Sequence, residues 1–110
     1  MSNFGANPND ELSFYKIVLD PQMEELRIPS SLVKRIKEEA MGEVLLLKGR
    51  GGDKCWNIKI RDDGNAMFFH GGWKEFVLEN HIEMAQLLFF NYDGMNTFTV
   101  RIFNKNGWEK

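Results

Sequence analysis

In the stretch KCWNIKIRDDG, which covers residues 54–64, polar and apolar residues alternate with a period of two. An extended strand would put two cations and an amide on one face and three apolar residues on the other: Asn57, Lys59 and Arg61 opposite Trp56, Ile58 and Ile60. Cations displace the counterions condensed on a nucleic acid, and arginine can also read guanine with two parallel hydrogen bonds. On the residues alone, a solvated strand face is the simpler interpretation, and a phosphate contact by Lys59 with base reading by Arg61 is the alternative. Asn57 suits an adenine contact and a backbone hydrogen bond equally well.

Other polar residues have a weaker case for binding. Arg27 stands between two apolar residues, so it should point outward, to a nucleic-acid groove or to water. Asn65 follows Asp63-Gly64 and more simply forms a turn than contacts a base. The cations at residues 34, 35 and 37 are most simply the solvated face of a helix. The run GRGG at residues 49–52 lacks the spacing of a P-loop or dinucleotide fingerprint, and we interpret it as a turn.

The residues give no support to a catalytic, metal or cofactor site. No serine, cysteine and histidine constellation is present, and His70 and His81 lie far apart with no carboxylate at a metal-site spacing. The single cysteine excludes an internal disulfide and favours a reducing, intracellular compartment. An acid pair at an exposed hairpin tip would lack the burial that tunes a general acid or base. We expect no enzyme activity, no metal and no cofactor.

Charge is unevenly distributed along the chain. The net charge of −2 by itself argues against a nucleic-acid partner, but residues 27–61 hold nine cations and four anions. This segregation is either one functional patch or chance. Hydrophobic residues make up 43% and charged residues 27%, as in a folded globular domain, and no apolar run approaches a membrane span.

The periodicity predicts one domain over residues 14–104, between tails at residues 1–13 and 105–110. We expect seven strands, at residues 14–19, 26–28, 43–48, 54–61, 65–70, 86–92 and 97–103. A short helix should follow Ser30-Ser31 and stop by Gly42, and a second should run from Trp73 to near His81. Asp63-Gly64 predicts a two-residue hairpin turn. These elements favour a closed or nearly closed antiparallel barrel capped by the helices. Strands apolar on both faces, as at residues 68–69 and 89–90, would meet the barrel core and a capping helix.

Five short segments then stand in a familiar order: FYK at residues 14–16, LRIP at 26–29, GWKEF and its helix at 72–80, LFFNY at 88–92 and FTVRIF at 98–103. Together they resemble the plant B3 domain, most of all its reproductive-meristem branch, over roughly residues 14–104. The resemblance implies an all-β-dominated, seven-stranded open β-barrel (a pseudobarrel) with two short α-helices. It also implies double-stranded DNA binding without catalysis, in a transcriptional regulator of the plant nucleus.

In the B3 family two arms enter the major groove. Here the resemblance implies a first arm at residues 20–27, with a cation at its base, and a second arm at residues 57–66. The implied DNA-binding residues are Lys16, Arg27, Asn57, Lys59, Arg61 and Asn65. With the resemblance, base reading by Arg61 and a phosphate contact by Lys59 become the favoured interpretation of the β-strand cations.

The chain departs from the family pattern at two places. Glu24 and Glu25 stand where many members carry basic residues, and Asp62 and Asp63 stand at the expected hairpin tip. Carboxylates there would repel the DNA backbone. The alternative function is therefore a B3-like interaction module with weakened DNA contacts, acting with other B3 domains or transcriptional partners.

Overall fold

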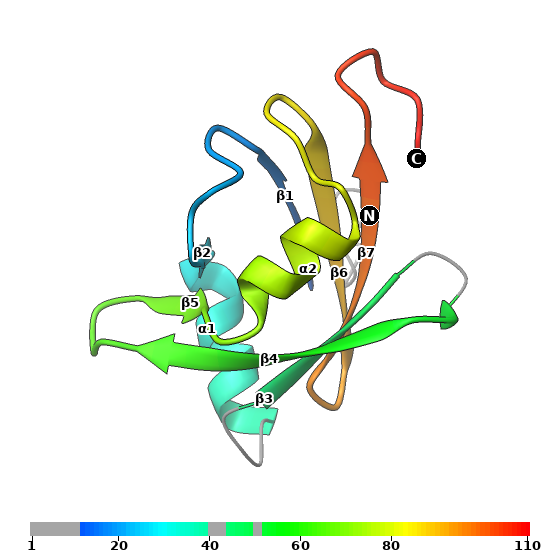
Figure 1. The fold of residues 1–110 in the computed structure, drawn as a ribbon. Coiled ribbons are helices and arrows are strands. Elements are labelled where there is room, and N and C mark those ends of the chain that lie inside the picture. The colour runs from blue at the N-terminus through cyan, green and yellow to red at the C-terminus, as the bar shows by residue number, and fades with distance from the viewer. Residues whose placement is uncertain (1–11, 40–43, 50–51) are drawn as a thin grey trace, which may run out of the picture.

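The computed structural model describes residues 12–39, 44–49 and 52–110, which form one seven-stranded mixed sheet and two helices (Figure 1). The strands are β1 (Ser13–Ile17), β2 (Leu26–Ile28), β3 (Val44–Lys48), β4 (Cys55–Asp62), β5 (Met67–Phe69), β6 (Leu87–Gly94) and β7 (Thr97–Phe103). The helices are α1 (Ser30–Glu39) and α2 (Trp73–Glu79). The predicted seven strands and two helices are confirmed.

The strand order is β1-β6-β7-β3-β4-β5-β2, so β1 and β2 form the two edges of the sheet. Within the described residues these edges do not pair with each other, and the barrel is open, as the resemblance implied. The expectation of an entirely antiparallel barrel is wrong at one place. β7 pairs with β3 in parallel, with Leu47 opposite Phe98, because the β6–β7 hairpin brings its second strand alongside β3 in the same direction.

Aromatic rings fill the inside of the curved sheet. Phe69, Phe90 and Phe98 are fully buried, and the Phe69 ring centroid lies 5.5 Å from that of Phe90 and 5.4 Å from that of Phe98. α2 adds Trp73 and Phe76, both buried, and Figure 1 shows this helix between the β1–β6–β7 part of the sheet and the β4–β5 hairpin. A core of large rings gives a small domain much buried apolar area per residue.

In β5, one of the two strands with consecutive rings, the outward ring is covered differently from what we expected. Phe69 and Phe90 point into the core, but the outward ring of Phe68 is covered by the guanidinium of Arg61, whose Cζ lies 4.2 Å from the ring centroid. A cation above a ring both shields the ring from water and is attracted to its face. An arginine therefore takes the place of the expected capping helix.

The hairpin between β4 and β5 has a longer loop than the predicted two-residue turn. Asp62 pairs with Met67, so residues 63–66 form the loop. The Asp63 carboxylate accepts the backbone N–H groups of Asn65 and Ala66, each at 2.8 Å. In a two-residue turn these backbone N–H groups would take part in strand pairing. Here the Asp63 side chain accepts their hydrogen bonds, so the loop can be longer.

The two predicted tails differ in how much of them the structure describes. Residues 1–11 lie outside the described residues. Residues 105–110 turn back to β7, where the backbone N–H of Lys110 donates to the carbonyl of Ile102 at 2.8 Å. None of the described helices is long and apolar enough to cross a membrane.

Candidate nucleic-acid interface

The predicted alternation along β4 is confirmed. Ile58 is fully buried, and Trp56 and Ile60 pack against the core. Asn57 and Lys59 are exposed, and Arg61 is partly exposed. The polar side of β4 therefore faces out of the barrel over its whole length.

Strand pairing brings the first and second arms together on this outer side. Arg27 of β2 and Arg61 of β4 are both register partners of Phe68 in β5. Residues paired across strands share a face of the sheet, so these three side chains form one row. We call the surface that carries this row the outer β2–β5–β4 face; its members are Glu25, Arg27, Asn57, Lys59, Arg61, Phe68 and His70.

A second row lies beside the first. The Nδ1 atom of His70 lies 3.1 Å from Oε1 of Glu25, and the His70 backbone N–H donates to the carbonyl of Lys59 at 2.9 Å. The Glu25, His70 and Lys59 row therefore continues the outer face toward the start of β2. The face carries three cations and one carboxylate.

Glu25 occupies one edge of the Arg61 guanidinium. Arg61 donates through Nε and one terminal nitrogen to the two carboxylate oxygens, each at 2.8 Å. This hydrogen bonding lowers the pKa of Glu25, against the raising effect of desolvation, and it also raises the pKa of Arg61. The fork with which we expect Arg61 to read a base is thus held by the first arm in the free protein.

No local pattern in the sequence indicated this pair, because its members are 36 residues apart. We interpreted Glu25 as a repulsive departure from the family. The structure instead makes it the link between the two arms.

Lys59 and Arg27 are the cations of this face that have no ion pair among the residues the structure describes. The stem of Lys59 lies against Gly71, where an added Cβ would be 3.1 Å from the Lys59 Cβ. This contact directs a mobile side chain without neutralising its charge. Both cations are available for a phosphate.

The remaining predicted residues are placed differently. Asn65 is exposed at the hairpin tip. Asn57 is exposed on the same face of β4 as Lys59, two residues earlier in the strand. Lys16 is half-buried on β1, on the side of the strand that carries Phe14. It lines a hollow of about 220 Å³ beneath residues 18–23 together with Arg27, so the structure places it at the base of the first arm and off the outer face.

The two aspartates at the hairpin tip are engaged within the protein. Asp62 accepts the N–H of Gly64 at 2.9 Å and lies 3.4 Å from Nζ of Lys37. Backbone hydrogen bonds are the main cause of the lowered pKa of both Asp62 and Asp63. These carboxylates shape the tip, and their charge is partly balanced by Lys37 and Arg61.

The sequence profile of the B3 DNA binding domain matches residues 14–106. The chain belongs to the B3 family. It is 37% identical over 99 residues to the B3 domain-containing protein Os11g0197600 of Oryza sativa subsp. japonica, covering 89% of this chain and 24% of that protein. It is 34% identical over 93 residues to the B3 domain-containing transcription factor VRN1 of Arabidopsis thaliana, covering 83% of this chain and 27% of that protein. The chain thus spans about a quarter of the length of these two relatives.

Solved structures agree with the B3 fold. The Arabidopsis thaliana protein At1g16640.1 aligns with a TM-score of 0.68 at 28% identity, over 86% of this chain and 92% of that one. The Arabidopsis FUS3–DNA complex aligns with a TM-score of 0.54 at 14% identity, over 79% of this chain and 92% of that one, and supports the fold alone. B3 domains are non-enzymatic DNA-binding domains of plant transcription factors, which confirms the expected class.

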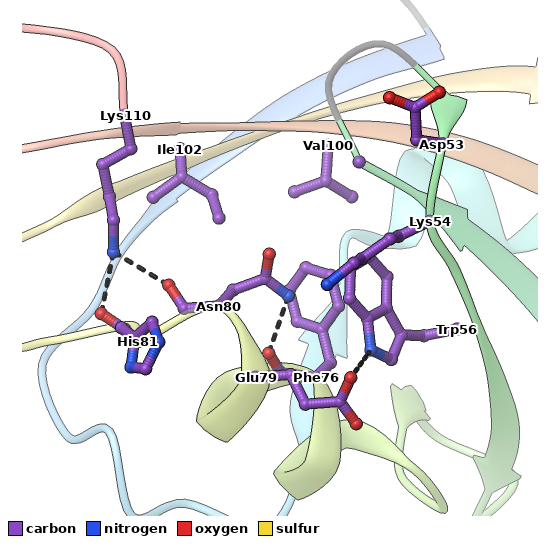
Figure 2. Close-up of a pocket in the computed structure, with 11 residues that line it drawn as sticks. Asp53, Lys54, Trp56, Phe76, Glu79, Asn80, His81, Val100, Ile102 and Lys110 are labelled. Atoms are coloured by element: carbon purple, nitrogen blue, oxygen red, sulfur yellow. Dashed lines mark hydrogen bonds between the residues drawn. The ribbon is translucent and has the colours of Figure 1, made fainter.

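A different part of this B3 domain holds a hollow of about 430 Å³, between β4 and the end of α2 (Figure 2). Trp56 Nε1 donates to Glu79 at 3.2 Å across it. Lys110 Nζ donates to the carbonyls of Asn80 and His81, each at 2.8 Å, where α2 ends. A cation there satisfies carbonyls that the helix leaves unpaired. The hollow contains none of the six predicted residues, and its polar contacts hold α2 to β4 and to the last residue.

Within the part of the chain that the structure describes, the histidines and carboxylates form no metal-binding group. Over residues 12–39, 44–49 and 52–110, no three histidine, cysteine or acidic side chains are close enough to hold an ion.

Proposed function

We propose that this B3 domain enters the major groove of double-stranded DNA with its outer β2–β5–β4 face. Residues 20–27 would be the first arm and residues 57–66 the second. The observation that carries the proposal is the row of Arg27, Phe68 and Arg61, which joins cations of both arms on one surface. A two-stranded ribbon matches a groove about 12 Å wide.

The contacts of each side chain suggest its role. Lys59 and Arg27, which are exposed and have no ion pair in the described part of the chain, would contact phosphates. Arg61 would release Glu25 and then read a base, because the same edge of its guanidinium donates to either partner. Asn57 and Asn65 would donate to and accept from base edges.

Lys16 keeps a lesser role in this proposal. From its position in the hollow beneath the first arm, it would support the arm and add positive potential near Arg27. We further propose that the protein containing this domain regulates transcription in the nucleus, together with other B3 domains or transcriptional partners. The kinship with plant B3 transcription factors supports this wider role.

The alternative, an interaction module with weakened DNA contacts, has one observation in its favour. Glu25 neutralises Arg61 in the free domain. If that pair never opens, Arg27 and Lys59 alone would give the face little affinity for DNA. The two functions therefore differ in whether a random duplex is bound at low salt.

Fluorescence anisotropy with a labelled random-sequence duplex tests the proposal at salt concentrations between about 50 and 200 mM. We expect binding that weakens as salt rises, and a decrease of about 0.9 in the salt slope for Lys59→Ala. Lys105→Ala is the matched control, since Lys105 is exposed in the turn that follows β7. Figure 1 shows the segment after β7 on the far side of the molecule from the β4–β5 hairpin.

Equal slopes for the wild type and both variants would reject the assignment of the face. Absence of binding even at the lowest salt would favour the interaction module.

A further inference from the structure

A groove of about 410 Å³ separates α1 from the tip of the β4–β5 hairpin. Arg27 lies at one side and Asn65 at the tip, both among the residues proposed to meet DNA. The opposite wall comes from α1 and carries side chains that we had interpreted as a solvated helix face: Lys34, Lys37 and Glu38.

Helix geometry explains why those three side chains share the groove. Residues three and four positions apart lie on one face of an α-helix, which puts Lys37 and Glu38 above Lys34. Leu32 and Ile36 are buried and fix the opposite face against the core. Arg35 does not line the groove, and it pairs instead with Glu39 at 2.7 Å.

The groove has a surplus of positive charge. It is lined by three cations and one carboxylate. Lys37 is partly neutralised by Asp62 at 3.4 Å, but Lys34 and Arg27 are exposed and have no ion pair within the described ranges. Clustered cations along a hollowed surface raise the local concentration of an anionic ligand.

We propose that this groove binds the phosphodiester backbone of the DNA strand that flanks the inserted hairpin. The inference rests on the proposed function, since a ribbon in the major groove has a sugar–phosphate backbone along each side. The groove begins at the tip of that ribbon, and it shares Arg27 with the outer β2–β5–β4 face and Asn65 with the second arm. Lysines at phosphates position a protein without reading sequence.

Lys34 and Glu38 have opposite expected effects. Lys34 supplies positive charge that no ion pair in the described residues neutralises, so Lys34→Ala should lose one phosphate contact. Glu38 is the carboxylate within the groove, so Glu38→Gln should strengthen binding by removing repulsion. A merely solvated helix face would give neither effect.

The test is anisotropy with a random duplex and with a second, unrelated duplex, at several salt concentrations. We expect Lys34→Ala to lower the salt slope by about 0.9 and to weaken binding equally for both duplexes. Lys34→Arg should retain the slope, and Glu38→Gln should bind more tightly than wild type. Arg35→Ala, which removes the same charge from the next position outside the groove, should change the slope much less.

Three outcomes separate this inference from its parent. If Lys59→Ala lowers the salt slope and Lys34→Ala leaves it unchanged, the proposal that the groove binds the DNA backbone is wrong and the proposed function stands. Equal effects of Lys34→Ala and Arg35→Ala would overturn the groove as well, because only net charge would matter. Unchanged slopes in both Lys59→Ala and Lys34→Ala would overturn both.

Discussion

At the residue scale, Glu25 decides what the free domain presents to a partner. Its carboxylate joins Arg61 of the second arm and lies 3.1 Å from Nδ1 of His70, the residue that follows β5, so it links the two arms in one contact. Both pair members are partly exposed, with 41% of the Arg61 side chain and 26% of the Glu25 side chain accessible. At such exposure an ion pair adds little stability and can exchange for a phosphate or a base.

Glu25→Gln should therefore strengthen binding to a random duplex and steepen its salt dependence. The change removes the anion that opposes DNA and returns the full charge of Arg61 to the face. Glu24→Gln is the matched control. The Glu24 side chain is 72% exposed, and its carboxylate lies 3.8 Å from Nζ of Lys74 rather than beside Arg61.

Anisotropy of the two variants, alone and in an Arg61→Ala background, measures the coupling. We expect Glu25→Gln to increase the affinity for the duplex more than Glu24→Gln does. This difference between the two variants should vanish in the Arg61→Ala background. Weaker binding by Glu25→Gln would show that Glu25 holds Arg61 in its working position instead of blocking it.

At the scale of elements, local patterns predicted the strands and helices, whereas contacts between distant segments were not accessible. The period of two placed β4 and its polar face correctly, because alternation depends only on neighbouring residues. The parallel β3–β7 pair left no such signal, since either direction of pairing buries the same apolar residues. The hairpin loop was longer than predicted because Asp63 binds two backbone donors.

Gly72 joins two of these elements. It precedes α2 with a φ of 95°, and an added Cβ would lie 2.5 Å from the carbonyl oxygen of Asn57 in β4. A side chain there would carry the left-handed backbone strain and would also push α2 away from the strand that bears the proposed interface.

Gly72→Ala should lower the free energy of unfolding by more than Gly107→Ala. Gly107 has a similar φ of 94° but has nothing within 4 Å of an added Cβ, so it isolates the backbone strain. We expect about 1–2 kcal/mol for Gly107→Ala and at least about 1 kcal/mol more for Gly72→Ala, measured by urea unfolding. If both variants lose the same free energy of unfolding, the added Cβ at residue 72 does not clash with the carbonyl of Asn57.

At the scale of the whole molecule, the arrangement of charge matters more than its sum. The chain carries a net charge of −2, yet pairing of β2, β5 and β4 gathers Arg27, Lys59 and Arg61 on one face. Three of the acidic residues that argued against DNA make hydrogen bonds within the protein: Glu25 between the arms, and Asp62 and Asp63 at the hairpin tip. Net charge is therefore a poor guide to the partner of this domain.

The candidate site was predictable in part. Alternation on β4 and between the apolar residues of β2 indicated which side chains point outward, and the family resemblance named the arms. Neither indicated that Glu25 would hold Arg61 or that α1 would face the hairpin tip, because both depend on how the sheet curves. Lys16 shows the same limit, since only the folded strand reveals that it lines the hollow beneath the first arm.

The proposed DNA interface is tested most directly by the amide chemical-shift changes on adding a random-sequence duplex to the ¹⁵N-labelled domain. We expect the largest changes in residues 25–27, 57–61 and 63–70, and smaller ones on the outer side of β1, β6 and β7 around Tyr15 and Arg101. Changes centred on Tyr15 and Arg101, with the outer β2–β5–β4 face unmoved, would contradict the proposed interface.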